Sequence, residues 1–325
     1  MTSKPDLKDS NGLELDRRVW AYDEDRRIAE IALKGRLEGE WEWLEPKRYF
    51  FTDNFEQDLK KDLHSLENAS QLLAHEEVEF IALNLASENP AQQNASYVWI
   101  RTLADGYLSY LFNQDNYLKA DKYLLESRTR FQTIQMLRTH TYLDCSVKEH
   151  LTSPLSFGSR VYVSPRVYRE EQWLLVTVGD YGEEFIHKSA LEPSTLPPLE
   201  WVRQFLDTPY LWGGRTAWGI DCSGLAQMYF RYQNIYIPRD ADQQETAFAV
   251  VTEPRAGDLA FFDGHVGILL EQNERGNWRM LHANSRHMSV TVDTLGEGEY
   301  GEYLSGILHG FGRWEGEIGV YWKPR

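Results

Sequence analysis

The feature that most constrains the fold is a glycine-rich loop running directly into a cysteine, Tyr210-Leu-Trp-Gly-Gly-Arg-Thr-Ala-Trp-Gly-Ile-Asp-Cys222-Ser-Gly-Leu. The apolar pattern of residues 222–234 predicts a buried helix that begins at the cysteine. Backbone N–H groups at a helix start lack an intrahelical partner, and the helix dipole favours an anion there. We therefore expect a lowered pKa and a nucleophilic role for Cys222, although a cysteine outside such a loop is more often a small core residue.

A thiolate nucleophile needs a base, and two of the nine histidines stand within apolar runs. His265 opens the run HVGILL after an Asp-Gly turn, and His282 lies 17 residues further on, in RMLHAN. A buried imidazole needs a hydrogen-bond partner. The spacing suits two adjacent antiparallel strands, on which one histidine orients the other. The competing interpretations are two satisfied core histidines or, together with Cys222, a zinc site.

Upstream of this region the chain consists largely of short β runs separated by turns. Strands recurring every 8–12 residues or so predict small barrels rather than βαβ units. Residues 55–75 carry leucines at helical spacing and predict a helix or a long inserted loop. The proline-rich segment 191–201 predicts a domain boundary. Beyond it we expect an α+β layout, with a short helix at 198–207 and strands at 258–262, 266–272, 278–284 and 290–295.

Composition narrows the classes of function. The 325 residues suggest two or three domains, and 34 basic against 50 acidic residues give a net charge of −16, which argues against nucleic acid and anionic membrane surfaces as partners. No apolar stretch approaches the roughly 20 residues of a membrane span, and no signal segment is evident, so we expect a cytoplasmic protein. Removal of a signal peptide would instead indicate the periplasm or cell envelope. Cys145 and Cys222 are too few for a disulfide framework, and a single disulfide stays open.

These motifs resemble the NlpC/P60 cysteine peptidases of bacterial cell-wall metabolism. Four stand in the family's order over about residues 195–295: PYLWGG…GIDCSGL, IPRDADQQ, AGDLAFF…HVGI and LHANS. The resemblance implies a papain-like fold, in which a helix bearing the cysteine packs on an antiparallel sheet bearing the histidines. It implies Cys222 as nucleophile, His265 as general base and His282 as the orienting third residue. It also places Tyr210 beside the thiol as a support for the oxyanion, and it implies no metal and no cofactor.

The upstream barrels and the PRDADQQ phrase are similar to the subgroup that carries bacterial SH3 (SH3b) domains, the γ-D-glutamyl-L-diamino acid endopeptidases, also called dipeptidyl-peptidase VI. The resemblance implies cleavage between D-Glu and the diamino acid of peptidoglycan stem peptides with a free N-terminal L-Ala. It implies Asp240 and Ser223 as substrate-binding residues, and a barrel tyrosine, Tyr107 or Tyr110, near the amine. A carboxylate suits an ammonium group. Asp240 is equally suited to cap a helix.

We therefore expect four parts: an N-terminal tail and short segment at 1–45, a divergent SH3b-like domain with an insertion at 46–125, an SH3b-like domain at 126–193, and an NlpC/P60 peptidase domain at 194–325. The expected partners are peptides of the type L-Ala-γ-D-Glu-diamino acid. Two alternatives stay open: a D,L-endopeptidase acting on intact cell-wall peptidoglycan, and a catalytically inactive wall-binding protein. The segment after residue 295 runs past the family's usual end, and we expect His287 and His309 at the surface.

Overall fold

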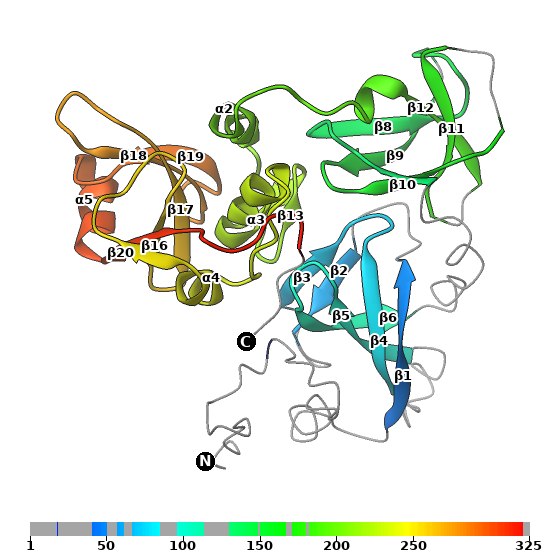
Figure 1. The fold of residues 1–325 in the computed structure, drawn as a ribbon, viewed down its shortest axis with the longest axis horizontal. Helices are drawn as coiled ribbons and strands as arrows, with labels where there is room; N and C mark the ends of the chain where they lie inside the picture. Colours follow the sequence, from blue (N-terminus) through cyan, green and yellow to red (C-terminus); the bar gives the residue numbers. More distant parts are fainter. Residues whose placement is uncertain are drawn as a thin grey trace.

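The structure, a computed structural model, describes residue 18 and the ranges 41–50, 57–61, 67–84, 96–113, 130–148, 150–166, 171–179 and 182–320. The expectations for the N-terminal tail, for the loop near 86–96 and for most of the segment 14–45 lie outside these residues. The described residues form three six-stranded antiparallel sheets and a two-stranded one. In Figure 1, the two sheets formed by residues 41–113 and 131–187 lie on one side of helix α3 (Cys222–Tyr232), and the sheet of the C-terminal domain lies on the other.

The first sheet has the strand order β1-β4-β5-β6-β2-β3. Its strands are β1 (Trp41–Phe50), β2 (Gln57–Lys60), β3 (Asn68–Leu72), β4 (Glu77–Asn84), β5 (Ser96–Thr102) and β6 (Leu108–Asn113). β1 spans the expected boundary between residues 45 and 46. The expected helix at 55–75 is wrong for the described residues, which form β2 and β3. Leu59 is fully buried in the sheet core, and pairing of β2 with β3 and β6 overrides the helical spacing of the leucines.

The second sheet has the order β7-β10-β11-β12-β8-β9. Its strands are β7 (Phe131–Thr133), β8 (Arg138–Tyr142), β9 (Leu151–Ser156), β10 (Arg160–Val163), β11 (Trp173–Thr177) and β12 (Glu183–His187), followed by the short helix η3 (Lys188–Ala190). Its core includes Ile134, Val161 and Ile186. The expectation of closely spaced short strands in both upstream regions is confirmed, whereas the SH3b-like identity of the two sheets stays a prediction.

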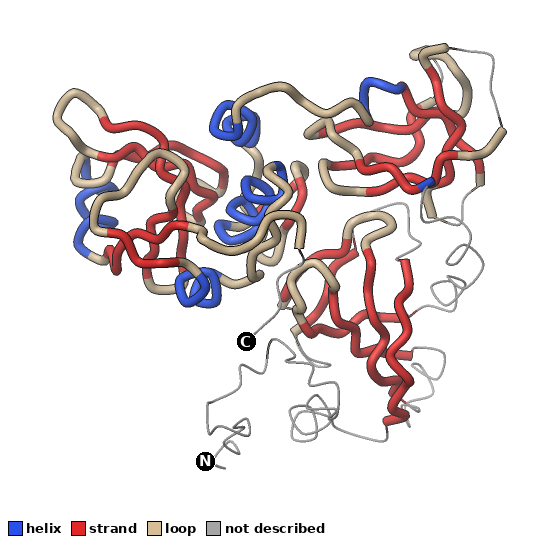
Figure 2. The backbone as a smooth tube through the Cα atoms, viewed as in Figure 1, coloured by secondary structure: helices blue, strands red, loops and turns tan. Residues whose placement is uncertain are grey.

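The C-terminal domain combines the third sheet with most of the helices, shown in blue in Figure 2. The sheet order is β15-β20-β16-β17-β18-β19. The elements are α2 (Pro198–Val202), η4 (Arg203–Phe205), β13 (Arg215–Thr216), β14 (Gly219–Ile220), α3 (Cys222–Tyr232), α4 (Ala241–Ala247), β15 (Ala249–Val251), β16 (Leu259–Phe262), β17 (His265–Gln272), β18 (Trp278–Asn284), β19 (Ser289–Thr294), α5 (Gly298–Gly306) and β20 (Leu308–Arg313). The helix followed by an antiparallel sheet confirms the expected layout. The segment after residue 295, to which the sequence assigned no element, forms α5 and β20, and β20 lies inside the sheet.

Helix α3 is the central element of this domain. Asp221 precedes it as N-cap and accepts a hydrogen bond from the N–H of Gly224 at 2.7 Å. Most of the helix is buried, and it packs against β17 and β18. This packing holds the start of α3, and with it Cys222, beside the start of β17. Within the described part of the chain, no helix is long and apolar enough to cross a membrane.

Candidate active site

Cys222 is the first residue of α3, and only 7% of it is exposed. Burial raises the pKa of its thiol to about 12, and the charge of Asp221 acts in the same direction. Hydrogen bonds from the backbone N–H groups of Val266 and Ser223 lower the pKa, but they do not offset burial. The expectation of a lowered pKa is therefore wrong: the helix start acts as expected, and desolvation of the thiolate outweighs it.

The two histidines lie on neighbouring antiparallel strands, as their spacing predicts. His265 begins β17 and His282 lies on β18, with Nε2 of His265 and Nδ1 of His282 2.8 Å apart. Burial, with a smaller contribution from His282, lowers the pKa of His265 to about 3. His265 is therefore a neutral imidazole around pH 7. Because its Nε2 is engaged, Nδ1 is the nitrogen left to act as a base.

Tyr210 lies in the loop before α3. Its backbone N–H donates to the carbonyl of Met288 at 2.9 Å. Burial raises the pKa of its hydroxyl, and the charges of Cys222 and Asp221 raise it further. The partly buried Tyr210 packs against the same apolar core that contains Cys222. Its role toward an oxyanion stays a prediction.

A buried ion pair supports the loop before α3. Arg239, 1% exposed, donates to both carboxylate oxygens of Asp221, at 2.6 and 3.1 Å. Arg239 also donates to the hydroxyl of Ser223 at 2.7 Å, and that hydroxyl lies 3.3 Å from Asp221. The predicted substrate-binding residue Ser223 is thus held by partners within the protein while it lines the pocket beside Cys222.

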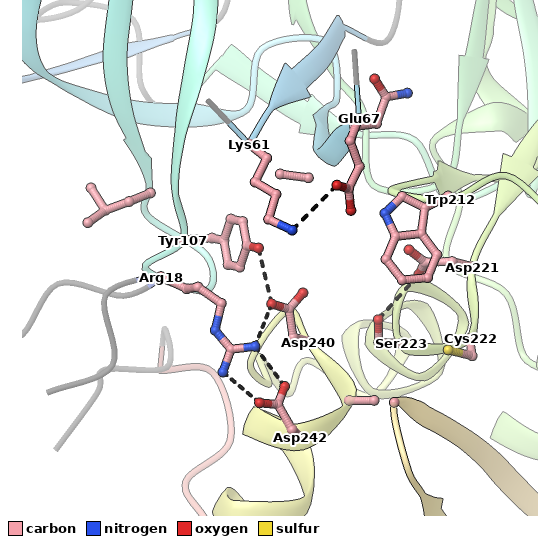
Figure 3. A pocket seen from close by; sticks show the side chains of 15 residues that line it. Arg18, Lys61, Glu67, Tyr107, Trp212, Asp221, Cys222, Ser223, Asp240 and Asp242 are labelled. Atoms are coloured by element: carbon pink, nitrogen blue, oxygen red, sulfur yellow. Dashed lines mark hydrogen bonds and ion pairs between the residues drawn. The ribbon is translucent and has the colours of Figure 1, made fainter. Parts of the chain in front are cut away.

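A pocket of about 290 Å³ opens between the first sheet and the C-terminal domain (Figure 3). Cys222 lines one part and Asp240 another. The hydroxyl of Tyr107 donates to Oδ2 of Asp240 at 3.1 Å. Burial raises the pKa of Asp240 despite the cations nearby. Asp240 is also the N-cap of α4, where its own N–H donates to the Gln243 side chain at 3.2 Å. Asp240 therefore caps α4 and also lines the pocket, and its binding of a substrate amine stays a prediction.

The two candidate tyrosines differ in their relation to the pocket, and the structure also places a cation, Arg18, beside Asp240. Tyr107 reaches the pocket, whereas Tyr110 is buried against Trp99, with ring centroids 3.7 Å apart. Arg18 donates to Asp240 at 3.1 Å and to both carboxylate oxygens of Asp242, at 2.6 and 2.8 Å (Figure 3). Sequence reasoning missed Arg18 because it is 222 residues from Asp240 and belongs to no motif.

Further residues missed from the sequence surround the same pocket. Lys61 and Glu67 form an ion pair at 3.4 Å, and the exposed Trp212 stands near them in Figure 3. Cys145 and Cys222 are not joined by a disulfide. Among the described side chains, no three His, Cys, Asp or Glu residues converge in a way that could hold a metal ion.

A cysteine that opens a buried helix, packed on an antiparallel sheet with two hydrogen-bonded histidines, is the arrangement of the cysteine-peptidase class. The NlpC/P60 family profile matches residues 207–309. A probable endopeptidase of Haemophilus influenzae is 32% identical over 129 residues, which cover 37% of this chain and 73% of that protein. The chain belongs to the NlpC/P60 family.

Two further comparisons extend beyond this domain. The gamma-D-glutamyl-L-lysine dipeptidyl-peptidase of Bacillus subtilis is 32% identical over 165 residues, which cover 46% of this chain and 54% of that protein. This chain thus spans about half the length of that relative. The crystal structure of an NlpC/P60 family protein from Bacillus cereus aligns with a TM-score of 0.59 and 18% identity, over 82% of this chain and 99% of that one. At this identity the alignment shows a shared fold.

Proposed function

We propose that this protein is a cysteine peptidase that cleaves between γ-D-Glu and the diamino acid of peptidoglycan stem peptides with a free N-terminal L-Ala. The observation that carries the proposal is the pocket shared by Cys222 and Asp240. A carboxylate held in the same pocket as a nucleophile suits a short peptide whose amine is bound while a bond further along is cut. The name of the Bacillus subtilis relative describes a dipeptidyl-peptidase of this kind, which supports the same substrate class.

In the proposed reaction, the sulfur of Cys222 attacks the carbonyl carbon while Nδ1 of His265 takes the thiol proton. An S–C bond forms, the C–N bond to the diamino acid breaks, and His265 returns the proton to the leaving amine. Water then hydrolyses the thioester, with His265 again as base. Because burial favours the neutral thiol and the neutral imidazole, proton transfer accompanies the attack rather than preceding it.

The remaining predicted residues have supporting roles in this proposal. His282 orients the base through its 2.8 Å contact with His265. A backbone N–H at the start of α3 stabilises the oxyanion, with Tyr210 beside it. Asp240 binds the substrate ammonium, with the hydroxyl of Tyr107 on the same carboxylate and Ser223 in the adjoining wall. The guanidinium of Arg18 on Asp240 supports a site suited to cations.

The first experiment tests the amine site with three versions of one peptide, L-Ala-γ-D-Glu-diamino acid: free amine, N-acetylated and muramyl-linked. A charge-assisted contact is worth roughly 1.5–3 kcal/mol, so blocking the amine should lower kcat/KM about ten- to hundredfold. Asp240→Asn should lose much of the preference for the free amine. Equal cleavage of all three peptides would favour the D,L-endopeptidase that acts on intact peptidoglycan.

The second experiment tests the nucleophile and its base. Cys222→Ala should abolish turnover while leaving the melting temperature near that of the unaltered protein. His265→Ala should lower kcat more than His282→Ala, because a base transfers the proton and an orienting residue acts through it. Residual peptidase activity in Cys222→Ala would refute the assignment. Failure of the unaltered protein to cleave any of the peptides would favour an inactive wall-binding protein.

A further inference from the structure

A row of polar side chains continues from the histidine pair into β19. Nε2 of His282 lies 2.9 Å from Oδ2 of Asp293, and the hydroxyl of Thr291 donates to the same oxygen at 2.9 Å. His282 pairs in register with Thr291 on the neighbouring strand, and Asp293 follows two residues later on the same face. His282 is fully buried, and the side chain of Asp293 is 19% exposed.

The direction of each hydrogen bond in this row follows from one backbone donor. The N–H of His287 donates to Oδ1 of Asn284 at 2.8 Å, which identifies the amide oxygen. Nδ2 of Asn284 therefore donates to the hydroxyl of Thr291 at 2.8 Å. Thr291, already an acceptor there, directs its own hydrogen to Asp293. Thr291 thus donates a hydrogen bond to the same carboxylate oxygen that His282 contacts.

Asp293 is ionised in this setting. The hydrogen bond from His282 holds its pKa below the ordinary value, and Thr291 adds to the effect although burial opposes it. An ionised carboxylate can only accept hydrogen bonds. Nε2 of His282 lies 2.9 Å from Asp293 and 3.5 Å from Nδ2 of Asn284, so the carboxylate is the nearer partner. A neutral His282 therefore carries its hydrogen on Nε2, facing Asp293, and its Nδ1 is an acceptor.

The tautomer of His282 then determines that of His265. Since Nδ1 of His282 accepts, the 2.8 Å contact requires the hydrogen on Nε2 of His265. Nδ1 of His265 is left with a free lone pair, which is the form a base needs. The opposite tautomer of His282 would donate from Nδ1, and His265 would then carry its hydrogen on Nδ1 and could not take a proton from the thiol.

We propose that Asp293 is a positioning residue that fixes the tautomers of His282 and His265 for proton transfer from Cys222. The inference rests on the proposed peptidase function, because a base must present a lone pair to the thiol. The proton moves from sulfur to Nδ1 of His265 and from there to the leaving amine, and Asp293 stays a carboxylate throughout. The ring of Tyr300 stacks on His282, with centroids 5.9 Å apart and planes at 21°, and limits rotation of that imidazole.

The kinetic test compares Asp293→Ala and Asp293→Asn with the unaltered protein. Both variants should lower kcat roughly 10- to 100-fold, the range expected for losing a hydrogen bond to a charged group. KM should stay within about twofold, because Asp293 is absent from the described lining of the pocket. Glu245→Ala is the matched control: it removes a carboxylate that lies 3.2 Å from His309, and kcat should not change. Asp293→Asn keeps the volume of the side chain, so it carries the test if Asp293→Ala does not fold.

The second readout does not depend on turnover. Histidine-selective ¹⁵N NMR in the Cys222→Ala background should show His282 with its hydrogen on Nε2, and a mixture of tautomers once Asp293 is replaced. Identical tautomers with and without Asp293, or an unchanged kcat, would overturn the inference. Absence of cleavage by the unaltered protein would refute the proposed function, and the tautomer measurement would still decide the role of Asp293.

Discussion

The two upstream sheets contact the C-terminal domain in different ways. The first sheet does so mainly through buried charged and polar groups: Glu76 holds Arg215 with two 3.0 Å contacts, and Asp105 accepts from Gln227 at 2.9 Å. The second sheet contributes an aromatic contact, with Phe157 4.5 Å from Trp201 between ring centroids, and a few hydrogen bonds to backbone atoms.

The residues that line the pocket show the same difference between the two upstream sheets. Of its described lining residues, those outside the C-terminal domain are Arg18 and residues of the first sheet and its adjoining turns. At Gly213, where φ is +80°, an added Cβ would lie 2.8 Å from the side chain of Asn68, so the loop before α3 rests directly on the first sheet. The first sheet is thus part of the site, whereas the second stabilises the domain from outside it.

The largest expected effect is at Glu76, which is 4% exposed. Burial would raise its pKa, but Arg215 and Arg231 more than offset this and keep the carboxylate ionised. Glu76→Gln removes the carboxylate that is hydrogen-bonded to the buried Arg215 and should lower the free energy of unfolding by about 3–5 kcal/mol in urea denaturation. The matched control is Glu77→Gln, which breaks the part-exposed 2.8 Å pair with Arg160 and should cost about 1 kcal/mol. Equal losses would mean that burial of the pair does not matter.

A second, pH-dependent effect is expected where the two upstream sheets meet. Nδ1 of His75 lies 3.1 Å from the carbonyl oxygen of Arg160, and Nε2 of the same ring accepts a hydrogen bond from the N–H of Gly179 at 3.1 Å. Burial lowers its pKa to about 4, so the folded protein resists its protonation. Stability is therefore full above pH 6.5 and falls as the pH approaches 4, with a loss of about 2 kcal/mol from this residue between pH 7 and pH 5.

His75→Gln retains a donor and an acceptor but does not titrate. Urea denaturation of both proteins at pH 7 and pH 5 gives the loss of free energy of unfolding on acidification. This loss should be about 2 kcal/mol smaller in the variant than in the unaltered protein. His265 also has a lowered pKa, so part of the acid sensitivity should persist in both. The same pH dependence in the two proteins would exclude His75 as the source.

A smaller effect is expected at the contact of the second sheet. Phe157→Leu keeps an apolar side chain against Trp201 and should lower the free energy of unfolding by about 1 kcal/mol. It should leave kcat/KM within twofold, because Phe157 does not reach the pocket.

Tyr107→Phe in the first sheet should show the reverse: little loss of stability, and weaker discrimination for the free amine. A change of substrate preference in Phe157→Leu would break the distinction between the two sheets.

The smallest effect is expected at Arg18, whose side chain is 37% exposed in its contacts with Asp240 and Asp242. Such ion pairs contribute less than about 1 kcal/mol to stability. Because the guanidinium occupies the carboxylate proposed to bind the substrate amine, Arg18→Ala should lower KM about two- to fivefold for the free-amine peptide. The N-acetylated peptide is the control, and an equal change of KM for both would refute competition at Asp240.

Local patterns in the sequence predicted the centre of the site well. The loop before Cys222 predicted α3, and the 17-residue spacing of His265 and His282 predicted adjacent antiparallel strands. Local reasoning failed where distant segments meet. The partners of Arg215 and Asp240 in the first sheet are 139 and 133 residues away, and no local pattern encodes such pairs. Asp293 left a weak signal, as a polar residue alternating with Thr291 in a strand beside His282.

The pairing of Glu76 with Arg215 also bears on how such proteins can be rearranged in evolution. Arg215 is 2% exposed and its described carboxylate partner comes from another domain. A C-terminal domain transferred to a new chain without its first sheet would expose that guanidinium to water and lose one wall of the pocket. An exchange of the second sheet would break an aromatic contact with the C-terminal domain and hydrogen bonds of Arg138 and Arg231 to backbone carbonyls, but no ion pair with that domain among the described residues. The first sheet and the C-terminal domain are therefore expected to be inherited as one unit, with the second sheet as the more replaceable part.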